Sequence, residues 1–156
     1  RELKAFPNLI VTQTLSKAYG LAGIRLGSCY ASKEIIEVLN RIKPPYNVNE
    51  LTQHRAKERL LHLKDVENEI ARILEERSIL EKKLTSISYI SKIYPSDANF
   101  ILVKVDNANL RYEQLLSNGI VIRNRTKQAL CKNTLRLTVG TKKENKKLIE
   151  DLIKIQ

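Results

Sequence analysis

The chain has 156 residues, 42% of them hydrophobic, which is enough for one domain, or for one domain and a piece of another. No apolar run approaches the roughly 20 residues that a membrane-spanning helix needs, so we predict no membrane association. The two cysteines, Cys29 and Cys131, lie far apart and match no metal-ligand spacing, which favours reduced thiols in a cytoplasmic protein and no metal site.

The chain is basic: lysine and arginine outnumber aspartate and glutamate by 28 to 17, which gives a net charge of +11. Such a balance suits nucleic acid or small anions. Because the basic residues are spread among acidic ones, only 5% of residues are aromatic and no nucleic-acid motif is present, we predict no nucleic-acid partner. A phosphorylated small molecule fits the charge equally well. A non-catalytic basic interaction module remains an alternative.

The first part of the chain predicts a strand and a short helix. Residues 9–13 form a β-branched run that we expect to be a buried strand. Ser32 is placed to cap a helix that Pro44 and Pro45 would end. The chain begins at Arg1 and enters the strand within a few residues, so we expect an upstream portion in the natural protein.

The rest of the chain predicts one long helix and a compact α+β domain. Apolar residues recur at helical spacing over residues 51–86, which predicts a single amphipathic helix with a solvated charged face. Thr141 and Glu144 form a capping box at the last helix. Beyond the long helix we expect strands at 90–94, 100–105, 120–123 and 135–139, and helices at 110–118 and 142–155.

The segment after the first strand carries the residues best suited to chemistry. Residues 14–27 read T-L-S-K-A-Y-G-L-A-G-I-R-L-G. Hydroxyls, glycine-exposed backbone amides and an arginine can bind a phosphate monoester, and a lysine beside them can form a Schiff base with an aldehyde on the same molecule. Pyridoxal phosphate carries both groups. A strand-to-loop turn with an incidental lysine is the alternative interpretation.

This segment resembles the cofactor-lysine motif of class II aminotransferases, which belong to the fold-type I group of pyridoxal-phosphate enzymes. The resemblance implies that Lys17 binds the cofactor covalently and acts as the catalytic base, and that Thr14, Ser16 and Arg25 contact the cofactor phosphate. It also implies the fold class, a mixture of α/β and α+β structure. We expect the edge of a large parallel-sheet domain at 1–45, a long interdomain helix region at 46–86 and a small sheet-plus-helices domain at 87–156.

Two arginines near the C-terminus form a second candidate site. In residues 134–141 the alternate apolar side chains share one strand face, so Arg136 should point from the other face, and Arg123 should do the same in residues 119–125. Two such arginines on adjacent strands either decorate an exposed face or bind an anion. The stretch resembles the end of histidinol-phosphate aminotransferases, which implies that Arg123 and Arg136 hold the phosphate of histidinol phosphate or the carboxylate of glutamate.

The resemblance implies transamination of L-histidinol phosphate with 2-oxoglutarate in histidine biosynthesis, by a cytoplasmic homodimer. Threonine-phosphate decarboxylase and aromatic aminotransferase remain alternatives, because the cofactor motif does not choose among them. In the family, the acid at the pyridine nitrogen, the ring stacked on the cofactor and the tyrosine at its phenolic oxygen come from upstream segments. We therefore expect the chain by itself to be inactive.

Overall fold

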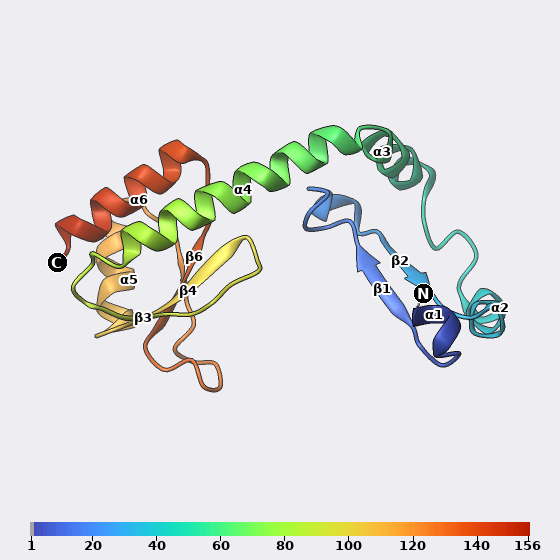
Figure 1. Cartoon of the computed structure of the whole chain (residues 1–156), viewed down its shortest axis with the longest axis horizontal. Helices are drawn as coiled ribbons and strands as arrows, with labels where there is room; N and C mark the ends of the chain where they lie inside the picture. Colours follow the sequence, from blue (N-terminus) through green and yellow to red (C-terminus); the bar gives the residue numbers. More distant parts are fainter. Residues whose placement is uncertain (1) are drawn as a thin grey trace. The chain divides into compact units, whose positions relative to one another are not determined.

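The computed structural model describes residues 2–156, and the chain divides into two compact units, one ending at Asn68 and one running from Glu69 to Gln156 (Figure 1). The first unit contains α1 (Glu2–Ala5), β1 (Val11–Thr14), the 3-10 helix η1 (Ala22–Ile24), β2 (Gly27–Tyr30), α2 (Lys33–Ile42) and α3 (Glu50–Leu61). The boundary falls inside α4 (Leu63–Leu84). The second unit continues with β3 (Ile90–Ile93), β4 (Phe100–Val105), α5 (Ala108–Ser117), β5 (Arg123–Asn124), β6 (Thr134–Thr138) and α6 (Lys142–Lys154).

The second unit is an antiparallel four-stranded sheet in the order β3-β4-β6-β5, with its helices on one face. Alternate residues of the two inner strands point into the core, as the period of a strand requires. Helices α4, α5 and α6 contribute the other side of this core. Its fully or nearly fully buried members include Leu80, Leu84, Ile101, Val103, Leu115, Leu135, Leu137 and Leu152. The opposite face of the sheet carries no packed helix of this unit.

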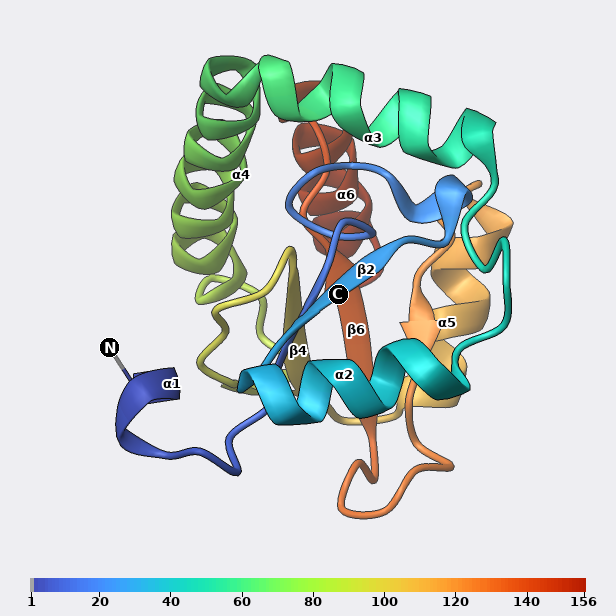
Figure 2. The ribbon, with the colours of Figure 1, turned by 90° about the vertical axis from the view of Figure 1, so that its right-hand side faces the viewer.

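The first unit is built around an antiparallel pair of strands, with α3 near one end of the pair and α1 and α2 near the other (Figures 1 and 2). We predicted a buried strand here, and this is wrong: every residue of β1 and β2 is exposed. Each strand pairs only with the other, and no described element covers either face. The flanking parallel strands that we expect for this domain are not among the described residues.

Several predicted elements are confirmed and others are corrected. Strand β4 and helix α6 lie where the pattern placed them, and the Thr141–Glu144 capping box is formed in both directions. The single helix expected over 51–86 is two helices, because the backbone leaves helical geometry at His62 (φ −110°, ψ 46°). The strand expected at 120–123 is reduced to β5. In the described part of the chain, no helix is long and apolar enough to cross a membrane.

Candidate active site

The structure brings the four predicted cofactor-site residues to one end of the β1–β2 pair. Thr14 is the last residue of β1, and Ser16 and Lys17 follow it directly, while Arg25 precedes β2. The antiparallel register pairs Thr14 with Gly27, so the end of one strand lies beside the start of the other. Thr14 Oγ1 accepts a hydrogen bond of 3.1 Å from the Ser16 backbone N–H.

The loop that joins the two strands is closed by backbone hydrogen bonds. The Leu15 amide donates to the Leu26 carbonyl at 3.1 Å, and the Leu21 amide donates to the Leu15 carbonyl at 3.0 Å. Gly27 must be small, because a Cβ there would lie 3.0 Å from the Gln13 carbonyl oxygen in the neighbouring strand. Arg25 takes a left-handed conformation (φ 53°), and its Nη1 donates to the Ala22 carbonyl at 3.0 Å. Lys17 is exposed on this loop.

Helix α3 holds the same loop from the side. Thr52 Oγ1 donates to the Ile24 carbonyl at 3.3 Å, and Arg59 Nε donates to the Tyr19 carbonyl at 3.0 Å. Leu21 of the loop and Ala56 of α3 are both buried, at 6% and 5% exposure. Sequence reasoning missed Thr52 and Arg59, because each contacts a backbone carbonyl far away along the chain and no local motif marks such a contact. Both residues therefore support the loop on either side of its glycines.

The donors at this end of the strands have the chemistry that a phosphate ester and an aldehyde require. Thr14 and Ser16 supply hydroxyls, Arg25 supplies a guanidinium and Lys17 supplies a primary amine. No acidic residue occurs in the segment from Thr14 to Gly27. The residues present thus fit pyridoxal phosphate. Among the described residues no group of three His, Cys, Asp or Glu side chains could hold a metal ion.

The second candidate site lies on the sheet face away from the helices. Arg123 of β5 and Arg136 of β6 are direct cross-strand partners. Leu135 and Leu137 on either side of Arg136 are fully buried, so Arg136 points to the opposite face, as the alternation predicted. The Arg136 guanidinium lies 5.1 Å from the centroid of the Phe100 ring. Its Nε atom is buried and has no hydrogen-bond partner among residues 2–156, whereas Arg123 is exposed.

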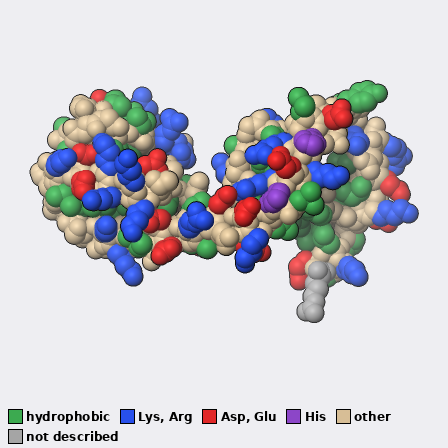
Figure 3. All heavy atoms as spheres, turned by 90° about the horizontal axis from the view of Figure 1, so that it is seen from above, with side chains coloured by type: hydrophobic (Ala, Val, Ile, Leu, Met, Phe, Trp, Pro, Cys, Tyr) green, Lys and Arg blue, Asp and Glu red, His purple; other side chains and the backbone are tan. Residues whose placement is uncertain are grey.

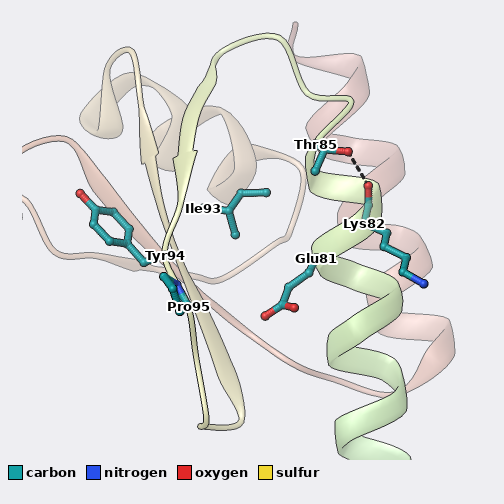
Figure 4. A pocket seen from close by; sticks show the side chains of 6 residues that line it. All are labelled: Glu81, Lys82, Thr85, Ile93, Tyr94 and Pro95. Atoms are coloured by element: carbon teal, nitrogen blue, oxygen red, sulfur yellow. Dashed lines mark hydrogen bonds between the residues drawn. The ribbon is translucent and has the colours of Figure 1, made fainter.

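The two arginines and the lysine loop belong to different units. A hollow of about 350 Å³ lies within the second unit, between α4 and β3, and Figure 4 shows its lining. The lining residues are Glu81, Lys82, Thr85, Ile93, Tyr94 and Pro95, none of which is a predicted site residue. Thr85 Oγ1 donates to the Lys82 carbonyl at 2.7 Å rather than into the hollow. We therefore place the candidate chemistry at the loop and the arginine pair.

Comparison with known proteins identifies the family. A family model described as aminotransferase class I and II matches residues 2–152. The chain belongs to this family. It is 63% identical, over 151 residues, to the histidinol-phosphate aminotransferase of Flavobacterium johnsoniae, and the match covers 97% of this chain and 43% of that protein. The chain therefore spans less than half the length of this curated relative.

Solved structures agree on the fold. The crystal structure of the histidinol-phosphate aminotransferase from Clostridium acetobutylicum matches with a TM-score of 0.89 and 26% identity, covering 99% of this chain and 47% of that one. A histidinol-phosphate aminotransferase from Sinorhizobium meliloti, solved in complex with pyridoxal-5'-phosphate, matches with a TM-score of 0.82 and 22% identity, covering 99% of this chain and 44% of that one. The fold-type I assignment made from the sequence is confirmed.

Proposed function

We propose that the full-length protein transfers the amino group of L-histidinol phosphate to 2-oxoglutarate in histidine biosynthesis, with pyridoxal phosphate as its cofactor. The observation that carries the proposal is the direct pairing of Arg123 with Arg136, where the buried Arg136 Nε has no partner in the described residues. A guanidinium pair of this kind suits a doubly charged phosphate or a carboxylate, since both accept bidentate hydrogen bonds. Family membership and the identity to a histidinol-phosphate aminotransferase support the same substrate.

In this proposal each residue of the loop has a defined task. Thr14 and Ser16 donate hydroxyl hydrogen bonds to the cofactor phosphate, and Arg25 binds the same group as a cation. Lys17 Nζ would hold the cofactor through its aldehyde carbon and would be freed when the substrate amine takes its place. The freed amine then takes the proton from the substrate carbon that bears the amino group. Pyridoxal phosphate, when bound, supplies the electron sink that makes this proton removable.

Arg123 and Arg136 orient the substrate by its far end. They bind the phosphate of histidinol phosphate in one half of the reaction and the distal carboxylate of glutamate or 2-oxoglutarate in the other. Holding the substrate by one end in this way lowers the entropic part of the barrier. The proposal also includes a cytoplasmic homodimer, which the family resemblance implies. Sedimentation of the full-length protein would test whether it is a dimer.

The substrate is tested by comparing turnover of L-histidinol phosphate, L-threonine phosphate and an aromatic amino acid by the full-length protein. We expect histidinol phosphate to give the highest kcat/KM. Decarboxylation of threonine phosphate, or preference for the aromatic amino acid, would replace the proposed activity by a related one. Preference for an unphosphorylated substrate would also remove the phosphate-binding role of Arg123 and Arg136.

The role of Lys17 is tested by absorbance spectra with added pyridoxal phosphate. The full-length protein should develop a visible band that Lys17→Ala lacks, and Lys57→Ala on the exposed face of α3 is a control that should keep it. The 156-residue chain should show this band weakly or not at all, because the first unit buries few apolar side chains, namely Leu21, Ala56 and Val66. A stable band that depends on Lys17 in the chain alone would show that the loop suffices for the cofactor.

The alternative of a basic interaction module is tested with nucleic acid. Binding to nucleic acid that is driven by phosphate contacts weakens steeply with salt. A gel-shift titration at low and at moderate salt therefore detects this kind of binding. Tight, salt-sensitive binding by a full-length protein that lacks transaminase activity would favour the module. The module leaves the residues around Lys17 without a role.

A further inference from the structure

A second pair of like charges lies on the same sheet as the arginine pair. Lys92 of the edge strand β3 and Lys104 of β4 are direct cross-strand partners. The pairing depends on an irregularity at Ser91, where the register shifts by one residue between Ile90 and Lys92. Ser91 Oγ donates to the Lys104 carbonyl at 3.3 Å. Because β-bulges redirect side chains, this bulge is what sets Lys92 opposite Lys104.

The two lysines share the helix-free face of the sheet with the arginines. Ile93 and Val103 are partners that pack toward the core, so Lys92 and Lys104 next to them point to the other side. Figure 4 shows the same alternation, with Ile93 directed toward α4 and the Tyr94 ring directed away. The Lys92 ammonium lies 4.7 Å from the centroid of the Tyr94 ring.

Register places the lysines close to the arginine pair. Leu102 pairs with Arg136, and Lys104 is two residues further along β4 on the same face. Lys104 is therefore a diagonal neighbour of Arg136, at about 7–8 Å between backbones. Because the lysines and the arginines lie on the same face of the sheet, their charges contribute to one positive field over that face.

In the part of the chain that the structure describes, the cationic side chains of this face lack the ion pairs that some other lysines make. Within the described residues, none of Lys92, Lys104, Arg123 and Arg136 has an ion pair. Some lysines on the helices do have them, as in the pairs Lys33–Glu37, Lys64–Glu67 and Lys146–Glu150. Figure 3, which views the molecule from the side of α4 and α6, shows acidic and basic side chains intermixed there.

Like charges directly opposite each other in a sheet are destabilising. The sheet carries two such pairs on one face, one of which depends on a bulge. A face of this kind attracts anions from solution. The lysines are exposed and compact point charges, so they suit guidance of an anion better than tight bidentate binding.

We propose that Lys92 and Lys104 form an outer cationic pair that guides dianionic substrates to Arg123 and Arg136. This inference rests on the proposed function, in which those arginines bind the phosphate or carboxylate end of the substrate. The field of the lysines raises the local concentration of the dianion beside the arginines, and so raises the association rate. It takes no part in the chemical step, so the effect belongs to kcat/KM.

Edge protection is the competing explanation for Lys92. Lysines on edge strands discourage pairing between molecules, and β3 is an edge of this sheet. That explanation does not extend to Lys104, which lies on an inner strand. It also makes a different prediction, since loss of edge protection changes self-association and leaves the salt dependence of kcat/KM unaltered.

The test compares two double variants of the full-length protein that remove the same charge. Lys92→Gln with Lys104→Gln removes the outer pair, and Lys82→Gln with Lys83→Gln removes two exposed lysines from the last turn of α4. We expect the first to lower kcat/KM for histidinol phosphate about 3- to 10-fold at low ionic strength, with kcat kept and the difference lost at high salt. The control should stay within about twofold of wild type, because α4 packs on the other face of the sheet.

A binding measurement gives a readout that is independent of turnover. Calorimetric titration with inorganic phosphate should give a weaker dissociation constant for the Lys92/Lys104 variant than for the Lys82/Lys83 variant, again only at low ionic strength. Equal phosphate affinity and equal salt dependence in the two variants would overturn the guiding role, and so would a loss confined to kcat. A wild-type protein that binds phosphate in this pattern but does not turn over histidinol phosphate would instead overturn the proposed function.

Discussion

Arg123 and Arg136 face each other across the β5–β6 ladder, although two guanidinium groups in this position repel. The repulsion is unfavourable for folding and favourable for binding an anion between them. Phe100 lies beside Arg136 and restricts the freedom of its side chain. Two like charges held together lower the stability of the fold and at the same time attract an anion. This combination is expected at a binding site and not in a sheet that has only a structural role.

Replacing Arg123 by Gln should therefore separate stability from function. We expect the free energy of unfolding to rise by about 0.2–1 kcal/mol, because a repulsive cross-strand pair is removed. The KM for the phosphorylated substrate should rise about 10- to 100-fold, since a charge-assisted hydrogen bond contributes about 1.5–3 kcal/mol. Chemical denaturation of the chain and steady-state kinetics of the full-length protein measure the two effects. Lys57→Gln, which removes one exposed charge from α3, should change neither; a destabilised Arg123→Gln would contradict the repulsion.

The face of Arg136 was predictable from sequence because alternation along a strand is a local property. Burial of Leu135 and Leu137 follows from the same period. The exposure of β1 could not be predicted in this way, because a strand is buried only by elements that cover it, and none of the described ones does. The break at His62 also has no local signal, since neither Gly nor Pro occurs near it and the apolar pattern continues through it.

The support of the lysine loop was hidden for a related reason. Thr52 and Arg59 act through backbone carbonyls of Ile24 and Tyr19, contacts that span 28 and 40 residues. A side chain that donates to a remote carbonyl leaves no spacing pattern in the sequence. The residue types of the loop were enough to predict its chemistry. The contacts that hold the loop in place could be identified only from the fold.

Thr52→Val tests whether this support matters for the cofactor. The valine keeps the shape of threonine and removes the hydroxyl that donates to the Ile24 carbonyl, next to Arg25. We expect the affinity of the full-length protein for pyridoxal phosphate to fall about fivefold, corresponding to about 1 kcal/mol for one hydrogen bond. Thr52→Ser keeps the hydroxyl and should stay within about twofold of wild type. Absorbance titration of the cofactor-free proteins with pyridoxal phosphate measures the affinity of each variant. Equal losses of affinity in both variants would assign the effect to packing and not to the hydrogen bond.

Asn145 joins α6 to two other parts of the second unit. Its side chain is 6% exposed, accepts a hydrogen bond from the Gly140 amide at 2.9 Å, and donates to the Gly140 carbonyl at 3.0 Å and to Glu76 Oε2 at 2.9 Å. Asn145→Ala leaves these three groups without this partner, so we expect a loss of about 2–3 kcal/mol in the free energy of unfolding. Lys143→Ala, an exposed change in the same helix, should cost less than about 0.5 kcal/mol. Similar losses in the two variants would show that water replaces the asparagine.

Tyr89 is a buried member of the hydrophobic core of the second unit, and it lies beside Arg111, which in turn binds Asp106. Its hydroxyl donates to the Leu152 carbonyl at 3.0 Å, and the Arg111 guanidinium lies 4.0 Å from the centroid of its ring. Arg111 also binds Asp106 at 2.8 Å and donates to the Ile155 carbonyl near the end of α6. The hydrogen bond from Arg111 holds the pKa of Asp106 below its usual range. Burial raises the pKa of Tyr89 to about 12, against the opposing effect of Arg111.

The raised pKa of Tyr89 predicts a loss of stability in alkali. A group whose pKa is higher in the folded state than in the unfolded state stabilises the fold fully below the unfolded value, about 10 for tyrosine. That contribution should disappear as the pH rises toward the folded pKa of about 12. Tyr89→Phe should cost about 1 kcal/mol at neutral pH, through the lost hydrogen bond, and should flatten the decline above about pH 10. Tyr112→Phe, which changes a partly buried tyrosine packed against the same core, is the control and should keep the wild-type slope. Urea unfolding of the chain at a series of alkaline pH values measures both curves. If Tyr89→Phe lost stability with pH as steeply as the wild type, the alkaline transition would have to be assigned to another group.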